Sequence, residues 1–164
     1  SIRDQGQIFG TGGELALGTN EWAQSITAGI SGQLTGIEIQ FHYGVPTPSP
    51  ALNLSIFNGG NPISGSALFS EQRVITTMDL ESDGFFTWDL NSTDLSFNAG
   101  EVFTFVLQAE AEGHNIAGND PPGYDGGELF QNGAAWISTL WMTPVKLLII
   151  FTTRPEKHPQ TNRA

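Results

Sequence analysis

The stretch QLTGIEIQFHY, residues 33–43, decides the fold, because apolar and polar residues alternate along it. The apolar set consists of Ile37, Ile39, Phe41 and Tyr43. The polar set between them consists of Glu38, Gln40 and His42. Successive side chains of a strand point to opposite faces, so this pattern predicts a strand with one buried and one wet face. Such a strand is typical of an antiparallel sheet.

On either side of this strand, the chain repeats short β patterns separated by turn residues. Further strands are predicted at residues 7–9, 21–28, 52–56, 67–76, 84–90, 101–109, 128–130, 135–138 and 146–153. Residues 101–109 are apolar on both faces, which places that strand at the centre of a sheet. No segment has a sustained helical period. The sequence therefore predicts an all-β fold, an antiparallel two-sheet β-sandwich of about nine strands.

Length and composition indicate one domain with a core of its own. The chain has 164 residues, and its 20 Gly and 9 Pro lie between strand-like patterns, which favours a turn-rich β domain over disorder. We assign residues 1–153 to the sandwich. Three of the six basic residues lie in RPEKHPQTNRA, residues 154–164, which we interpret as a tail or as a linker to a neighbouring domain.

Charge and cysteine content exclude several classes of function. The formal net charge of −11, with no cluster of Lys or Arg in the body of the chain, argues against binding to nucleic acid or anionic lipid. The chain has no cysteine, so it has no disulfide, no thiolate metal site and no cysteine nucleophile. No apolar run approaches the roughly 20 residues of a membrane helix, so we expect no membrane insertion.

Several segments resemble a family of secreted proteins. The segments are AQSITAG (23–29), GQLTGIEI (32–39), LSIF (54–57), YDGGEL (124–129) and LIIFTT (148–153). Together they resemble a jelly-roll-like domain that recurs in secreted and surface proteins of bacteria and is similar in shape to carbohydrate-binding modules. The resemblance spans roughly residues 4–153 and carries no catalytic signature. It implies a jelly-roll-like sandwich, an extracellular or cell-surface location, and a binding or structural role.

The long Gly-rich stretch at residues 113–141 is the first candidate for a ligand site. A sugar presents apolar CH faces and many hydroxyl groups, so its site combines aromatic rings with carboxylates and amides. Tyr124 and Trp141 supply rings that loop residues flank. The polar candidates are His114, Asn115 and Asp125. Two further rings of this stretch, Phe130 and Trp136, are more typical of core residues.

Calcium is the second candidate ligand. Ca²⁺ takes six to eight oxygen ligands from carboxylates, amides and main-chain carbonyls. Asn119, Asp120 and Asp125 lie in the same irregular stretch and could wrap a structural ion. A second acidic patch is formed by Asp79, Glu81, Asp83, Asp89 and Asp94. Neither cluster has the spacing of an EF-hand loop, and the alternative for both is solvated carboxylates in turns.

Catalytic chemistry has weak support. Glu110 and Glu112 would point the same way if their strand continued, but exposed acids are routine on a wet face. No Gly-x-Ser-x-Gly motif occurs, and the three His residues are scattered. The sequence therefore predicts a non-catalytic extracellular binding module, with polysaccharide or another glycan as its ligand. The alternatives are a structural or adhesive surface module without a small-molecule site, and a glycan-active enzyme with an unrecognised site.

Overall fold

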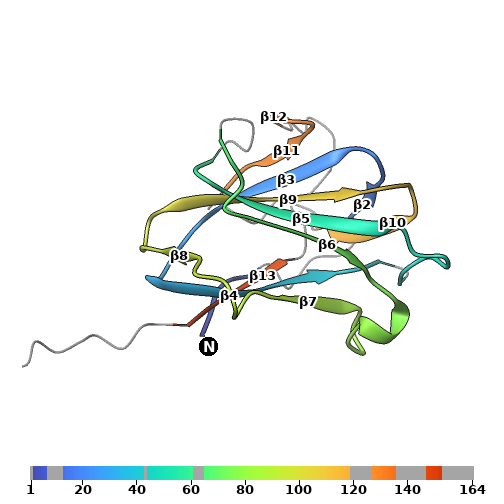
Figure 1. The fold of residues 1–164 in the computed structure, drawn as a ribbon, viewed down its shortest axis with the longest axis horizontal. Coiled ribbons are helices and arrows are strands. Elements are labelled where there is room, and N and C mark those ends of the chain that lie inside the picture. Colours follow the sequence, from blue (N-terminus) through green and yellow to red (C-terminus); the bar gives the residue numbers. More distant parts are fainter. Residues whose placement is uncertain are drawn as a thin grey trace, which may run out of the picture.

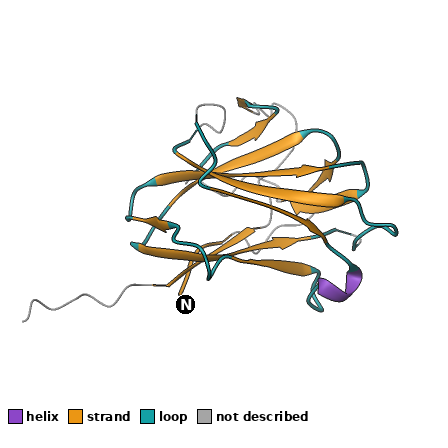
Figure 2. Cartoon of the chain, in the orientation of Figure 1, coloured by secondary structure: helices purple, strands orange, loops and turns teal. Residues whose placement is uncertain are grey.

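The computed structural model describes residues 2–6, 13–42, 44–60, 65–118, 127–135 and 147–152. In these residues the chain forms two antiparallel sheets packed face to face, with a small two-stranded sheet at one end (Figure 1). Within the same residues, one 3₁₀ turn, η1 (Thr77–Asp79), interrupts the strands (Figure 2). The all-β antiparallel sandwich expected from the alternating patterns is confirmed.

The five-stranded sheet forms one layer of the sandwich. Its path runs β1–β13–β4–β7, and β8 also pairs with β4. The strands are β1 (Ile2–Gly6), β4 (Gly32–Gln40), β7 (Phe85–Asp89), β8 (Ser96–Phe97) and β13 (Leu147–Thr152). The first and last described strands are therefore neighbours, with Ile2 opposite Phe151.

The six-stranded sheet forms the other layer, in the order β12–β11–β3–β9–β5–β6. The strands are β3 (Glu21–Thr27), β5 (Ala51–Asn58), β6 (Phe69–Val74), β9 (Val102–Ala109), β11 (Leu129–Gln131) and β12 (Ala134–Ala135). The strand apolar on both faces, β9, lies inside this sheet as expected. The chain passes between the two layers from β3 to β4, from β4 to β5, from β6 to β7 and from β8 to β9.

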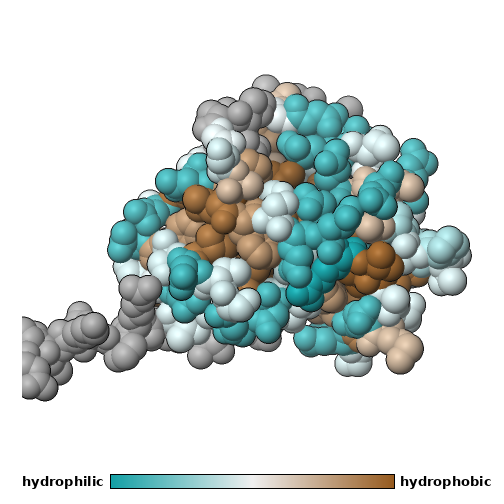
Figure 3. Space-filling model, viewed as in Figure 1, coloured by the Kyte–Doolittle hydropathy of each residue, from teal (hydrophilic) through white to brown (hydrophobic). Residues whose placement is uncertain are grey.

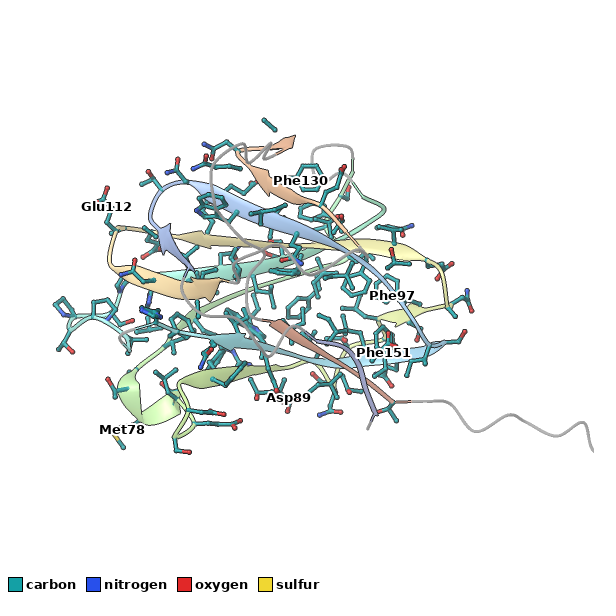
Figure 4. The ribbon with its side chains drawn as sticks, turned by 180° about the vertical axis from the view of Figure 1, so that it is seen from behind. Met78, Asp89, Phe97, Glu112, Phe130 and Phe151 are labelled. Carbon is teal, nitrogen blue, oxygen red and sulfur yellow. The ribbon has the colours of Figure 1, made fainter. Side chains whose placement is uncertain are left out.

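The core lies between the two layers and follows the alternation of the strands. In β4, Ile37 and Ile39 are fully buried, whereas Glu38 and Gln40 are part-exposed. The largest fully buried side chains include rings from both sheets: Trp88, Phe103, Phe105 and Phe151. Phe97 stacks on Phe103 with ring centroids 4.5 Å apart, and Phe151 meets both rings edge-on. Figure 4 shows Phe97 and Phe151 in the space between the layers.

A second apolar cluster lies on the outer face of the six-stranded sheet. It consists of Ala23, Val106 and Phe130, with Phe57 packed against it. Phe130 was expected in the core; its side chain is indeed buried, but on the opposite side of the sheet from the main core. Trp136, the other ring expected in the core, lies outside the described residues.

The prediction of an irregular stretch from residue 113 onward is partly wrong. Residues 114–118 form a strand, β10 (His114–Gly118), which pairs with β2 (Gly13–Leu17). The sequence signal was missed because each strand is short and its partner lies about a hundred positions away. The strands β1, β2, β8 and β10 raise the number of strands above the expected value. The strand expected at residues 7–9 and the position of Tyr43 lie outside the described residues.

Candidate functional site

The described residues include two of the residues predicted to bind a ligand, His114 and Asn115. The other predicted ligand or metal residues are Asn119, Asp120, Tyr124, Asp125 and Trp141, and all of them lie outside the described residues. The site that the structure allows us to build therefore begins at β10 and the strands beside it.

His114 is buried and holds a loop in place. Its Nε2 lies 2.8 Å from the main-chain oxygen of Pro50, and its ring meets Phe41 edge-on at 5.5 Å. Its Nδ1 has no hydrogen-bond partner among the described residues. Through these contacts His114 ties the proline-rich loop to β10. Its fully buried ring is directed into the protein rather than to solvent.

Asn115, the next residue, lines a surface hollow. The hollow has a volume of about 330 Å³ and is bounded by the bend before β3 and the turn between β9 and β10. Its lining consists of Ala16, Leu17, Gly18, Thr19, Asn20, Glu112, Gly113 and Asn115. A Cβ on Gly18 would lie 3.0 Å from Cγ of Glu112, so glycine allows this close approach of the two turns. Figure 4 shows Glu112 pointing outward from its turn.

Beside this hollow, four strands bring polar side chains into one row. Glu21 of β3 is paired with Gln108 of β9, Gln108 with Asn53 of β5, and Asn53 with Gln72 of β6. Their neighbours Trp22, Leu52, Leu54 and Leu107 are core residues, so all four polar side chains point to the outer face. Paired strands lie about 4.8 Å apart, so the polar groups recur at that spacing. We call this set the polar row.

Hydrogen bonds fix the orientation of the polar row. Gln72 Nε2 donates to Glu110 Oε1 at 2.8 Å, and Gln108 Nε2 donates to the main-chain oxygen of Thr19 at 3.3 Å. Asn53 Nδ2 donates to Ser55 Oγ at 3.1 Å. In the described part of the chain, Oε1 of Gln72 and Oε1 of Gln108 accept no hydrogen bond. These oxygens are therefore available to a ligand.

A second hollow lies along the polar row and adjoins the first. It has a volume of about 370 Å³ and is lined by Thr19, Asn53, Gln72, Gln108, Ala109 and Glu110. Because Thr19 lines both hollows, they form one continuous surface, which we call the polar end. Its described lining includes the carboxylates of Glu110 and Glu112 and no Lys or Arg.

Glu110 and Glu112 do not form the same-face pair that a continued strand would have given. Strand β9 ends at Ala109, and residues 110–112 bend away from it. The two carboxylates consequently line different hollows of the polar end. A paired-carboxylate site required the strand to continue through both residues, and the strand ends before them.

The second acidic patch consists of separate turn contacts. Asp79 Oδ2 accepts hydrogen bonds from the main chain and the hydroxyl of Thr76, each 2.7 Å long. The Thr76 hydroxyl, followed by its main-chain N–H, lowers the pKa of Asp79 below its ordinary value. Asp89 accepts from the main chain of Asn91 at 2.9 Å. Within the described ranges, no group of three or more His, Asp or Glu side chains is arranged to hold a metal ion.

Sequence reasoning missed Asn53, Gln72 and Gln108 as site residues. Each is a polar residue on the outer face of a strand, which the sequence pattern makes visible. The alignment of the three is not visible, because it depends on the register of strands that are far apart in the chain. A polar residue at the outward position of each neighbouring strand was the only signal present.

Neither a protein-family model nor a curated protein matches the chain. The fold therefore defines the class: an all-β protein built as an antiparallel two-sheet sandwich. In the described residues, no helix has the length and apolar character needed to cross a membrane.

Proposed function

We propose that the protein is a non-catalytic glycan-binding module that acts outside the cell or on its surface. The observation that carries the proposal is the polar row, which aligns Glu21, Gln108, Asn53 and Gln72 across four strands. A row of hydrogen-bonding groups at regular spacing suits a ligand that repeats its own hydroxyl groups.

The hollows of the polar end supply concavity, and their hydrogen-bonded amides supply orientation. A binding site for a small molecule needs a small number of well-placed polar groups that fix the orientation of the ligand. Because Gln72 and Gln108 are held by Glu110 and Thr19, little side-chain entropy is lost when a sugar docks.

Two predicted rings complete the proposal. Tyr124 and Trp141 remain our candidates for stacking on the apolar face of a sugar, because a glycan site commonly combines rings with amides. Asn115 of the polar end and Asp125 remain the predicted polar partners, whereas the buried ring of His114 holds the proline-rich loop. A structural Ca²⁺ held by Asn119, Asp120 and Asp125 also remains part of the proposal.

Affinity electrophoresis in gels that contain polysaccharides tests the proposal. We expect at least one polysaccharide to retard the protein. The double variant Gln72→Ala, Gln108→Ala should weaken binding about tenfold or more, because two hydrogen bonds of about 0.5–1.5 kcal/mol each are lost. Gln40→Ala is the matched control, because Gln40 is a part-exposed amide on the five-stranded sheet.

The companion variant Tyr124→Ala, Trp141→Ala tests the predicted rings. If binding survives this change but not the loss of the two glutamines, the rings are excluded and the polar row is retained. If no polysaccharide retards the protein, a structural or adhesive module is favoured instead. Release of sugar by the purified domain would favour an enzyme.

A further inference from the structure

The polar end carries free oxygen acceptors beside the remaining N–H donors of its amides. Gln72 and Gln108 each use one N–H inside the protein, while their Oε1 atoms accept nothing within the described residues. Glu110 accepts from Gln72 through Oε1, which leaves its Oε2 for a ligand. An ionised carboxylate only accepts hydrogen bonds, so Glu112 adds further acceptors. A ligand with many hydroxyl groups can use both kinds of group, because a hydroxyl both donates and accepts hydrogen bonds.

The negative charge at the polar end disfavours anionic ligands. Glu110 and Glu112 line the two adjoining hollows, and Glu21 is at one end of the polar row. No basic side chain is present among the described lining residues, and the whole chain carries a net charge of −11. An anionic group placed here would be repelled and would find no positively charged partner.

We infer that the polar end selects neutral, hydroxyl-rich glycans and rejects glycans that carry carboxylate or sulfate groups. This inference rests on the proposed glycan-binding function. Each hydroxyl of a neutral sugar can donate to one of the free oxygens, whereas a uronate or a sulfate ester brings acceptors and a negative charge. Selection therefore arises from electrostatic repulsion of charged ligands as well as from hydrogen bonds to neutral ones.

The test compares chemically matched polysaccharides on the intact chain. Hydroxyethyl cellulose and carboxymethyl cellulose share a backbone and differ in charge, and pullulan and sulfated pullulan form a second pair. Laminarin, galactomannan and xylan extend the neutral panel, and polygalacturonate extends the charged one. We expect at least tenfold tighter binding to a neutral polymer than to its charged derivative.

Ionic strength provides an independent readout. Raising NaCl from about 0.01 M to about 1 M shortens the Debye length from about 30 Å to about 3 Å. We expect the affinity for the neutral polymer to change less than twofold over this range. The charged derivative should bind measurably better at high salt, because its repulsion is screened.

The variant Glu110→Gln, Glu112→Gln removes the charge while it retains side chains of nearly the same size. The ratio of its affinity for the neutral polymer to its affinity for the charged derivative should fall about tenfold, because the repulsion is removed while both polymers lose the same acceptor oxygens. The control Asp94→Asn, Glu128→Gln removes two carboxylates that do not line the polar end, and it should leave this ratio unchanged.

The outcomes separate the inference from the function on which it rests. Binding to no polysaccharide at all would overturn the proposed function. Equal binding to both members of a matched pair, or preference for the charged member, would overturn only the inference. An equal fall of the affinity ratio in the control variant would assign the selection to overall charge and would also overturn it.

Discussion

At the scale of single residues, Gly127 occupies a position where no side chain fits. A Cβ at this position would lie 1.7 Å from the main-chain oxygen of Ser25. The contact is fixed on both sides, since Ser25 N donates to Glu128 O and Glu128 N donates to Ser25 Oγ. These bonds hold the segment before β11 against β3.

We expect Gly127→Ala to destabilise the domain, because the added methyl must push two main chains apart. The loss should be about 1–3 kcal/mol, as for other overpacked sites. A thermal melt followed by circular dichroism would measure it as a fall in Tm of roughly 2–4 °C for each kcal/mol. Gly65→Ala is the control, because a Cβ there meets no atom of the described residues within 4 Å. Equal melting of the two variants would contradict the close contact.

Asp79 offers a second test at this scale, through its pKa. Hydrogen bonds from Thr76 lower the pKa of Asp79, and those from Asn98 lower the pKa of Glu101. Because both folded pKa values are lowered, each group contributes stability above its unfolded pKa and loses it as the pH falls through its folded pKa. Acidification through the folded pKa values therefore lowers the stability of the folded protein.

A carboxyl ¹³C NMR titration should find both pKa values below those of unfolded peptides. Thr76→Val should raise the pKa of Asp79, because the hydroxyl donor is removed, and it should leave Glu101 unchanged. The Glu101 resonance is thus an internal control. An unchanged Asp79 titration in the variant would show that the Thr76 hydroxyl does not contribute.

At the scale of elements, β6 forms an edge of the six-stranded sheet and is protected by charge. Its alternate residues Glu71 and Arg73 point toward the core side, where they form an ion pair of 2.9 Å. Glu71 Oε2 accepts the indole N–H of Trp88 of β7 at 2.6 Å, and Arg73 lies 5.7 Å from the centre of the same ring. The pair closes the edge of the sandwich between β6 and β7.

Inward-pointing charge discourages the edge from pairing with another chain. The exposed apolar residues near this strand are Leu68 and Val74, one before its start and one at its end. Figure 3 shows brown areas near the two ends of β6, separated by hydrophilic surface. The edge therefore presents no continuous apolar strip.

We expect Glu71→Ala to destabilise the protein by about 1–3 kcal/mol, because it leaves the buried indole N–H of Trp88 without an acceptor. Glu71→Gln keeps an acceptor oxygen and should cost less. Urea unfolding followed by tryptophan fluorescence measures both changes. If the alanine variant were as stable as the glutamine variant, the hydrogen bond to Trp88 would contribute nothing.

At the scale of the whole molecule, the net charge of −11 attracts cations and so favours the proposed calcium ion. An ion bound only by the folded state stabilises it by RT ln(1 + [L]/Kd), which is about 2.7 kcal/mol at a hundredfold excess over Kd. We expect the Tm to fall when EDTA is added and to recover when excess Ca²⁺ is returned.

The variant Asp120→Asn, Asp125→Asn should show no response to EDTA. Mg²⁺ in place of Ca²⁺ controls for general screening of a negatively charged surface. A Tm that EDTA leaves unchanged would exclude a structural ion.

The strand pattern and the core could be predicted because they depend on local alternation. Ile37, Ile39 and Phe41 were expected on the buried face of one strand, and all three are buried. The strands β2 and β10 could not be predicted, because GELAL and HNIAG are short and become strands only when each finds the other. Of the predicted ligand residues, Asn115 lines a hollow, while the buried ring of His114 holds a loop.

The sequence by itself determined an antiparallel sandwich and the side of each strand that faces the core. It could do so because the side-chain period of two repeats within every strand, and burial of the apolar side stabilises one assignment over the other. The tertiary structure alone decided that Glu21, Gln108, Asn53 and Gln72 stand in one row. Their alignment depends on hydrogen-bond registers between β3, β9, β5 and β6, and each register is set by packing between segments distant in the chain.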